Sequence, residues 1–365
     1  MKEIRCTRVA LVGLALGLAF AASAAAQLQP LDLDRGASGL GLALRQVGAS
    51  GRVLYVTAHP DDEHNGVLVR LARGLGLRTV LLSLTRGEGG QNAIGPELAS
   101  ALGVLRTEEL MAMHRFDGVE QRFGRPFEFG YSFSVEETFE RWGREETLGD
   151  TVRVIREVRP DVILTLPLES GGGGQHHQAV AQLTRDAFRD AADPERFPGQ
   201  LEGGLRPWQA RTLYQGGTGG FALTLPGTPV EVPTGVYDPL LGMTWQELGS
   251  RARALHRCQG MRQLKADPGE ARGVYFLVDA EPPLGDDLEG DILAGLDTTL
   301  VGLARFAPAR DSLRSALVEL QGTAEVARTA FDPHRPSAAV VPLAEHLGAT
   351  RELLGRLSEH VEDPT

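Results

Sequence analysis

Apolar residues along the chain form short continuous runs that alternate with longer segments in which they recur every three or four positions. The short runs indicate buried strands, which we predict over 53–57, 79–84 and 162–166. The longer segments indicate helices, which we predict over 63–74, 96–114, 139–158 and 175–191. Strands that alternate with helices of this length imply βαβ units and a mostly parallel sheet.

The pattern changes in the second half of the chain. Residues 193–240 are rich in Gly, Pro and Thr and contain only short strand candidates such as 211–215. A helix is expected over 248–264, and an edge strand over 274–278. Beyond these, amphipathic spacing predicts helices over 292–303, 312–331 and 340–361. The fold class that follows is α/β, a Rossmann-like, doubly wound, mostly parallel sheet with a helical C-terminal appendage.

The first residues have the order of a secretory signal peptide. Lys2, Arg5 and Arg8 precede the apolar run 9–22, and a stretch of small residues ends at Ala26. The run is shorter and richer in Ala and Gly than a good spanning helix. We therefore expect cleavage near Ala26, export to the periplasm or medium, and no stable membrane insertion afterwards. An uncleaved membrane anchor is the competing interpretation.

The charge and cysteine content of the chain limit its expected binding partners and disulfides. The chain has 37 Lys and Arg residues against 48 Asp and Glu, a net charge of −11, and removal of residues 1–26 would move it to −13. An acidic protein gains little from counterion release on a polyanion, so nucleic acid is not an expected partner. Cys6 would leave with the signal peptide. Cys258 would then be the only cysteine, and no intrachain disulfide could form.

Ionisable residues cluster just after the first predicted strand, in Ala58-His59-Pro60-Asp61-Asp62-Glu63. Active sites of open parallel sheets gather at the carboxyl ends of strands. If Pro60 starts a helical turn, His59 and Asp62 face the same side, as two ligands of one metal ion would. Asp61 then points elsewhere and is free to act as a base. The competing interpretation is a helix cap in which an aspartate accepts backbone amides and His59 is incidental.

A second polar cluster follows the strand predicted over 162–166. The glycines 171–174 lead into His176 and His177 at the start of a predicted helix. One histidine here would complete a His/Asp/His set around a single zinc ion and leave a coordination position open for water. A structural zinc site would instead need four closed ligands, usually including cysteine. The competing interpretation is a surface histidine pair at a helix start.

These motifs resemble a known family, the zinc-dependent de-N-acetylases of the LmbE-like or PIG-L group, which includes N-acetylglucosaminyl deacetylases. The resemblance covers about 52–188, extends more weakly to about 278, and is most specific at 58–63. It implies that His59 and Asp62 are zinc ligands and that Asp61 is the general base.

The same resemblance assigns further roles by position. His177 matches the last histidine of the family's second motif and is implied to be the third zinc ligand. Arg106 matches an arginine that holds a polar group of the substrate, and Asp117 is a weaker match on the substrate side. The polar, glycine-rich turn 85–92, with Glu88 at its centre, is expected to line the substrate cleft.

This chain departs from the family at one position. The first histidine of the second motif is replaced by Gly174, and His176 stands where the family has aspartate. The family's histidine is given the role of protonating the leaving amine or stabilising the oxyanion. We favour His176 as its replacement, because the backbone ties His176 to a ligand. His256, from the later helix, is the alternative.

The sequence therefore predicts an exported hydrolase with one catalytic zinc that removes an N-acetyl group from an amino sugar or glycoconjugate. Zinc would lower the pKa of its bound water toward ~7, and Asp61 would take the proton as that water attacks the amide. A hydrolase of a different amide is one alternative. Another is a secreted carbohydrate-binding protein that has lost turnover, which the missing histidine favours and the intact Asp61 disfavours.

Four segments are expected on this basis. They are a signal peptide in 1–26, a lead-in in 27–50, the LmbE-like catalytic domain in 51–283 and a helical C-terminal extension in 288–362. The extension has no catalytic-looking cluster. We expect it to shape the cleft or to form the contact of a homo-oligomer.

Overall fold

The computed structural model describes residues 34–90, 92–168, 174–216, 225–262, 265–266, 268–283, 290–306 and 311–358. The predicted signal peptide and the glycines 171–173 lie outside these ranges. Within the described part of the chain, no helix is both long enough and apolar enough to cross a membrane.

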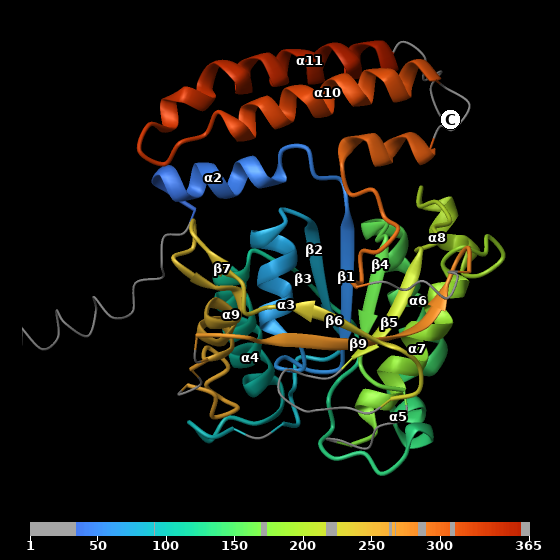
Figure 1. Cartoon of the computed structure of the whole chain (residues 1–365). Coiled ribbons are helices and arrows are strands. Elements are labelled where there is room, and N and C mark those ends of the chain that lie inside the picture. Colours follow the sequence, from blue (N-terminus) through green and yellow to red (C-terminus); the bar gives the residue numbers. More distant parts are fainter. Residues whose placement is uncertain are drawn as a thin grey trace, which may run out of the picture. The chain divides into compact units, whose positions relative to one another are not determined.

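Seven strands of the described residues form one mixed sheet in the order β3-β2-β1-β4-β5-β9-β6 (Figure 1). They are β1 (Arg52–Thr57), β2 (Arg78–Ser83), β3 (Glu120–Phe123), β4 (Val162–Thr165), β5 (Thr212–Gly216), β6 (Pro229–Pro233) and β9 (Arg272–Ala280). The first five in this order are parallel, whereas β9 is antiparallel to both β5 and β6. The order 3-2-1-4-5 confirms the predicted Rossmann-like α/β fold.

Helices cover both faces of this sheet. One face carries α3 (Asn65–Val69), the π-helix η1 (Arg70–Gly74), α4 (Ala99–Asp117) and α9 (Trp245–Arg253). The other carries α5 (Val135–Trp142), α6 (Arg144–Val158) and α7 (His176–Asp190). Alternate residues of β1 enter the two cores, since Leu54 and Val56 pack with α6 and α7 while Val53 and Tyr55 pack with α3 and α4. Burial on both faces explains why β1 is a continuous apolar run.

Several predicted elements differ from the structure. The helix expected over 248–264, for example, is α9 and ends at Arg253. The helix expected over 139–158 is divided at Gly143, whose φ of +71° ends α5 before α6 begins. We expected β9 to be an edge strand. It lies instead between β5 and β6, and β6 forms the edge of the sheet. β6 has exposed prolines at both ends, which suits an edge strand that needs no further partner. Part of the lead-in is helical, as α2 (Gly36–Gln46).

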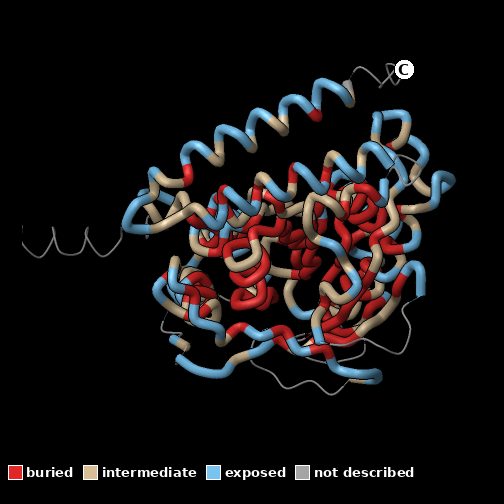
Figure 2. The backbone as a smooth tube through the Cα atoms, turned by 45° about the horizontal axis from the view of Figure 1, so that its top comes forward, coloured by how far each residue is buried: buried red, intermediate tan, exposed pale blue. Residues whose placement is uncertain are grey.

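The C-terminal region is largely helical, as predicted, although residues 292–299 of the helix expected over 292–303 are turns and loop. It contains the 3-10 helices η2 (Leu300–Phe306) and η3 (Pro336–Ala339) and the helices α10 (Asp311–Thr329) and α11 (Val340–Ser358). A small core joins α10, α11 and η2, and α2 lies beside α10 (Figure 1). Figure 2 shows that α11 is mostly exposed. The remaining short elements are α8 (Pro198–Glu202) and the hairpin of β7 (Tyr237–Asp238) and β8 (Met243–Thr244).

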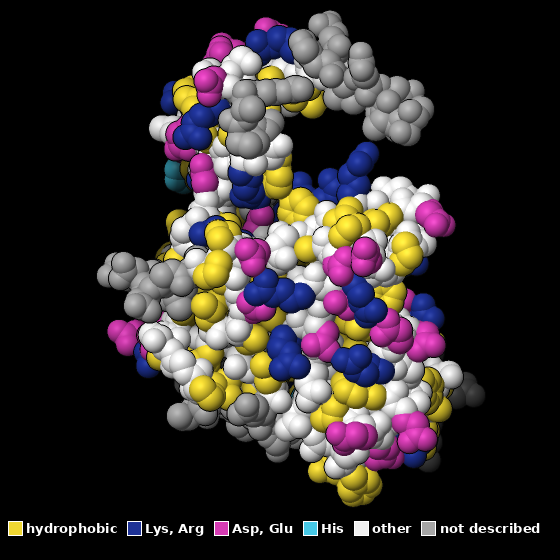
Figure 3. Space-filling view, turned by 90° about the vertical axis from the view of Figure 1, so that its right-hand side faces the viewer, with side chains coloured by type: hydrophobic (Ala, Val, Ile, Leu, Met, Phe, Trp, Pro, Cys, Tyr) yellow, Lys and Arg dark blue, Asp and Glu magenta, His cyan; other side chains and the backbone are white. Residues whose placement is uncertain are grey.

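Charges of both signs are mixed on the side of the molecule that carries α5 to α8. Figure 3 shows Lys and Arg side chains beside Asp and Glu side chains there, without a continuous basic surface. Arg144 pairs with Asp186, and Arg196 pairs with Glu145. This face therefore has the mixed charge of an ordinary solvated surface.

Candidate metal and catalytic site

The sheet brings the two predicted clusters together. β1 and β4 are adjacent parallel strands, with Val56 paired with Thr165, so their carboxyl ends share one edge of the sheet. The segment 58–63 follows β1 directly, and α7 begins at His176 after β4. Because both clusters lie at strand carboxyl ends, they form one site, as expected for an open parallel sheet.

Three potential ligand atoms converge at this edge. His177 Nε2 is 3.2 Å from His59 Nδ1 and 3.1 Å from an Asp62 carboxylate oxygen. His59 Nδ1 is 3.4 Å from the other Asp62 oxygen. Ligands held ~2.0–2.1 Å from one tetrahedral ion lie roughly 3.3 Å apart, so the spacing and the donor types fit a single zinc ion. These three residues form a group that could hold a metal ion.

The backbone fixes the Asp62 carboxylate in this arrangement. The amides of Ala58 and His59 donate hydrogen bonds to Asp62 Oδ2 at 3.0 and 2.8 Å. Burial alone would raise the pKa of Asp62, but His177 and His59 hold it well below its usual value. The helix-cap interpretation does not describe this segment, because the N-cap of α3 is His64. The segment is also a turn without the predicted helical geometry at Pro60, yet His59 and Asp62 still meet.

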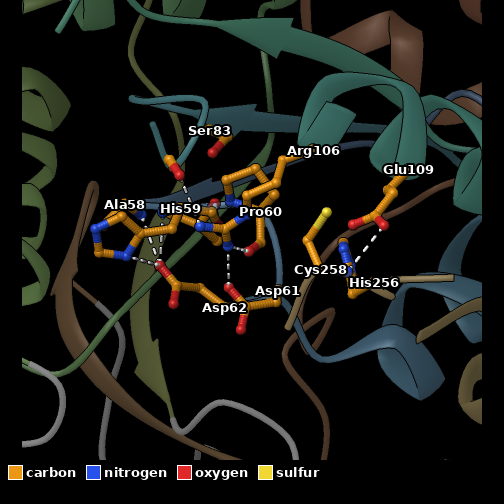
Figure 4. Close-up of polar contacts among 12 residues, drawn as sticks. Ala58, His59, Pro60, Asp61, Asp62, Ser83, Arg106, Glu109, His256 and Cys258 are labelled. Carbon is orange, nitrogen blue, oxygen red and sulfur yellow. Dashed lines mark hydrogen bonds and ion pairs between the residues drawn. The ribbon is translucent and has the colours of Figure 1, made fainter. Parts of the chain in front are cut away.

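Asp61 occupies a strained position beside the three ligand residues. Its φ is +102°, a left-handed conformation that costs a non-glycine residue about 1–3 kcal/mol. Arg106 donates to its carboxylate at 3.0 Å and to Pro60 O at 2.5 Å, and Figure 4 shows the Asp61 carboxylate directed toward Arg106. Burial raises the pKa of Asp61, and the adjacent Asp62 raises it further, although Arg106 acts in the opposite direction. A carboxylate with a raised pKa suits a general base.

Glu63 and His256 form a buried pair that contacts the backbone of Asp61. The Asp61 amide donates to Glu63 Oε2 at 3.0 Å, and Glu63 Oε1 lies 2.9 Å from His256 Nε2. Neither the Glu63 nor the His256 side chain is exposed. Burial would raise the pKa of Glu63, but His256 lowers it to about 2. His256 therefore holds Glu63 in the interior, and the alternative that it reaches the cleft as an acid does not agree with this position.

Replacing His256 with alanine is expected to destabilise the fold by about 3–5 kcal/mol, because the Glu63 carboxylate would stay buried without its partner. The free energy of unfolding in urea would measure this loss. As a control, Arg78→Ala removes the half-exposed Arg78–Glu120 pair and should change it by less than about 1 kcal/mol. A loss below 1 kcal/mol for His256→Ala would show that Glu63 does not depend on His256.

His176 lies behind the ligand residue His59. Its Nδ1 is 3.1 Å from His59 Nε2, and its ring is stacked on Trp142 and meets Phe129 edge-on. Burial, followed by the charges of His59 and His177, lowers the pKa of His176 to about 3. A general acid must carry an ionisable proton, and an imidazole with so low a pKa is in its neutral form at neutral pH. The buried position against His59 argues against the predicted acid role and fits a residue that orients His59.

The three predicted substrate residues have different places. Arg106 lines the pocket at the site, although its guanidinium is occupied by Gly87 O, Pro60 O and Asp61. Glu88 is buried and accepts the amide hydrogens of Arg86 and Glu128, while its neighbours Gly89 and Gly90 line the pocket.

Asp117 lies at the end of α4 and has no exposed surface. Its carboxylate contacts His114 Nδ1 at 2.9 Å and accepts the Val119 amide hydrogen at 3.0 Å. A carboxylate enclosed in this way cannot meet a ligand, so the structure argues against the predicted substrate contact.

The pocket also includes residues that sequence reasoning missed. It has a volume of about 310 Å³, and Glu128, Tyr131 and Gln259 line it together with the predicted residues. The alternating aromatic residues of 127–133 were the available signal, but they carry no chemical motif. A larger cavity of about 790 Å³ includes Asp161 and Arg211, which precede β4 and β5. It therefore lies at the opposite, amino edge of the parallel strands, away from the metal-binding residues.

A doubly wound sheet with a His/Asp/His set and a further carboxylate at its strand ends has the residues that a mononuclear hydrolytic metal site would need. Residues 54–188 match the family described as PIG-L: GlcNAc-PI de-N-acetylase. A 1D-myo-inositol 2-acetamido-2-deoxy-alpha-D-glucopyranoside deacetylase from Streptomyces avermitilis is 34% identical over 214 residues, which cover 51% of this chain and 71% of the relative. The chain belongs to the PIG-L family.

Two further comparisons describe how far the similarity reaches. A deacetylase of the same description from Kineococcus radiotolerans is 36% identical over 201 residues, and the match spans 47% of this chain and about half, 54%, of that relative. The solved structure of N,N'-diacetylchitobiose deacetylase from Pyrococcus horikoshii aligns with a TM-score of 0.43 at 18% identity. That alignment covers 66% of this chain and 90% of the other.

Proposed function

We propose that this protein is a zinc-dependent hydrolase that removes an N-acetyl group from an amino sugar. The observation that carries the proposal is the convergence of His59, Asp62 and His177 on one point, with the carboxylate of Asp61 beside them in an open pocket. Its volume of about 310 Å³ lies at the lower end of the ~300–1,000 Å³ range of ligand pockets and suits a substrate of about one sugar residue. The names of the relatives, which describe acetamido sugar deacetylases, support this substrate class.

The residues divide the work of amide hydrolysis. Zinc held by His59, Asp62 and His177 would supply an acidified water and polarise the amide carbonyl. The Asp61 carboxylate accepts a proton from the attacking water and returns it to the nitrogen as the C–N bond breaks, which yields acetate and a free amine. Arg106 keeps this carboxylate in place by its hydrogen bond.

The raised pKa of Asp61 predicts a particular pH profile. Activity requires the ionised carboxylate, so kcat/KM should fall with decreasing pH, and the midpoint of this acid limb should lie above the ~3.9 of an ordinary aspartate. Arg106→Met should move the acid limb of the kcat/KM profile to still higher pH. The loss of a nearby positive charge raises the pKa of the Asp61 carboxyl further.

Arg106→Lys is the matched control for this profile. It keeps the charge and should leave the limb close to that of the wild-type protein, even if turnover falls. A limb that stays in place in Arg106→Met would show that the titrating group is not Asp61.

The function itself can be tested with a panel of N-acetylated amino sugars and glycoconjugates. The zinc-loaded protein is incubated with each compound, and mass spectrometry measures the free amine and the released acetate. We expect deacetylation of at least one 2-acetamido sugar and its loss on chelation of the metal. Binding of a panel member without any acetate release would favour the carbohydrate-binding alternative, and release of another acyl group would favour a different amide specificity.

We also propose that the protein acts outside the cytoplasm, on a glycan or glycoconjugate. The order of basic, apolar and small residues in 1–26 supports this location. Mass spectrometry of the protein from cell fractions would test it, since export with cleavage predicts an N-terminus near Gln27.

A further inference from the structure

The backbone conformation at Gly174 disfavours residues other than glycine. Its φ is +89°, in the region that glycine adopts readily and other residues rarely do. A Cβ built there would lie 3.7 Å from both Cδ2 and Cε2 of the Tyr131 ring. The chain therefore combines glycine at position 174 with a conformation that favours glycine, and the Tyr131 ring lies within van der Waals contact of this position.

Tyr131 belongs to the wall of the same pocket. It lines that pocket together with His59, Asp61 and His177, while 67% of its surface remains exposed. The neighbouring ring of Phe133 meets it edge-on, with 5.0 Å between the ring centroids. The wall is also tied to α7, because the Gln175 amide donates to Ser132 O at 3.3 Å, two residues before His177. The phenol is thus accessible to a ligand and connected to the metal-binding residues.

A hydrogen-bond donor near the carbonyl oxygen, where negative charge develops, would add to the polarisation that zinc supplies and speed hydrolysis of the amide. His176 also lines the pocket, but it is 2% exposed and its Nδ1 is engaged with His59, while His256 is bound to Glu63. Arg106 is held by Gly87 O, Pro60 O and Asp61. A phenol is a donor at neutral pH and needs no ionisation to act.

We propose that Tyr131 is a catalytic residue whose hydroxyl donates a hydrogen bond to the carbonyl oxygen of the scissile amide as it becomes an oxyanion. This proposal rests on the proposed function. It assigns the hydrogen-bond donor to the oxyanion to the loop 127–133, which carries Tyr131. Tyr131 gives up no proton. The proton that reaches the leaving amine is the one that Asp61 takes from water, so no other acid is required.

The first test removes only the hydroxyl, in Tyr131→Phe. We expect kcat to fall about 10- to 100-fold, toward the lower end of losses for an oxyanion donor because the ring is exposed. KM and zinc content should change little. Tyr237→Phe, which alters another exposed tyrosine that does not line the pocket, is the control and should keep wild-type kcat. A kcat within twofold of wild type in Tyr131→Phe would overturn the proposal.

A second test does not depend on turnover. The probe is the methylphosphonamidate of 2-amino-2-deoxyglucose, whose phosphoryl oxygen stands for the oxyanion, and calorimetry measures its binding to zinc-loaded protein. Tyr131→Phe should weaken this binding by the same factor as it lowers kcat/KM. Equal binding by both proteins would overturn the role of Tyr131.

The two proposals can fail separately. Deacetylation by the wild-type protein with unchanged kcat and probe binding in Tyr131→Phe would retain the proposed function and reject Tyr131. Probe binding that needs the hydroxyl, without deacetylation of any panel compound, would reject the proposed function and retain Tyr131 as the donor to the tetrahedral oxygen in this pocket. No binding of the probe to either protein would overturn the assignment of Tyr131. A loss of kcat in Gln259→Leu but not in Tyr131→Phe would transfer the role to Gln259.

Discussion

Replacement of His177 by alanine is expected to abolish both zinc binding and turnover. His177 Nε2 lies 3.2 Å from His59 Nδ1 and 3.1 Å from Asp62, so its removal leaves only two of the three converging groups. Loss of residues that merely orient ligands weakens zinc binding by about 10- to 100-fold, and loss of a ligand should exceed that range. Metal analysis after dialysis, together with acetate release, would measure both effects.

Gln178→Ala is the matched control for this variant. Gln178 follows His177 in the first turn of α7 and does not line the pocket, so its removal should leave zinc content and turnover unchanged. Full zinc occupancy in His177→Ala would mean that the metal is bound elsewhere. The assignment of all three ligands would then have to be abandoned.

Asp61→Asn is expected to retain zinc and to lose most of the activity. The amide has the size of the carboxylate but cannot accept the proton of the attacking water, and loss of a general base costs about 10²- to 10⁴-fold in rate. Steady-state kinetics on an N-acetylated sugar and metal analysis of the same sample would separate the two properties.

The neighbouring carboxylate provides the contrast. Asp62→Asn should lose zinc, because Asp62 contributes to the ligand set, whereas Asp61 faces Arg106. Near-normal turnover in Asp61→Asn would leave Asp61 with only a structural role in the turn. Loss of zinc in both variants would show that the two aspartates do not divide the functions in this way.

Much of the fold could be predicted because its determinants are local. The apolar runs of β1, β2 and β4 are continuous since helices cover both faces of these strands, and each was predicted to within one or two residues. Errors occurred where a single backbone conformation mattered. Gly143 divides a predicted helix by adopting a positive φ, and periodicity alone does not reveal such a break.

The candidate site was predictable only in part. The residues 58–63 and His177 follow from motif and spacing, and the adjacency of β1 and β4 brings them together. The neighbours of these residues did not follow. His176 was expected to act in the cleft as an acid, yet its ring packs against Trp142 and Phe129 and its Nδ1 contacts His59.

The sequence by itself determined the strand and helix pattern, the type of chemistry and the identity of the residues that could hold zinc. Tertiary structure alone decided which distant side chains surround them. Glu63 meets His256 across 193 positions, and Tyr131 meets Gly174 from a loop of another βα unit. The physical reason is that steric rules and hydrophobic periodicity act within a few residues, whereas such contacts depend on strand order and on the paths of the connecting loops.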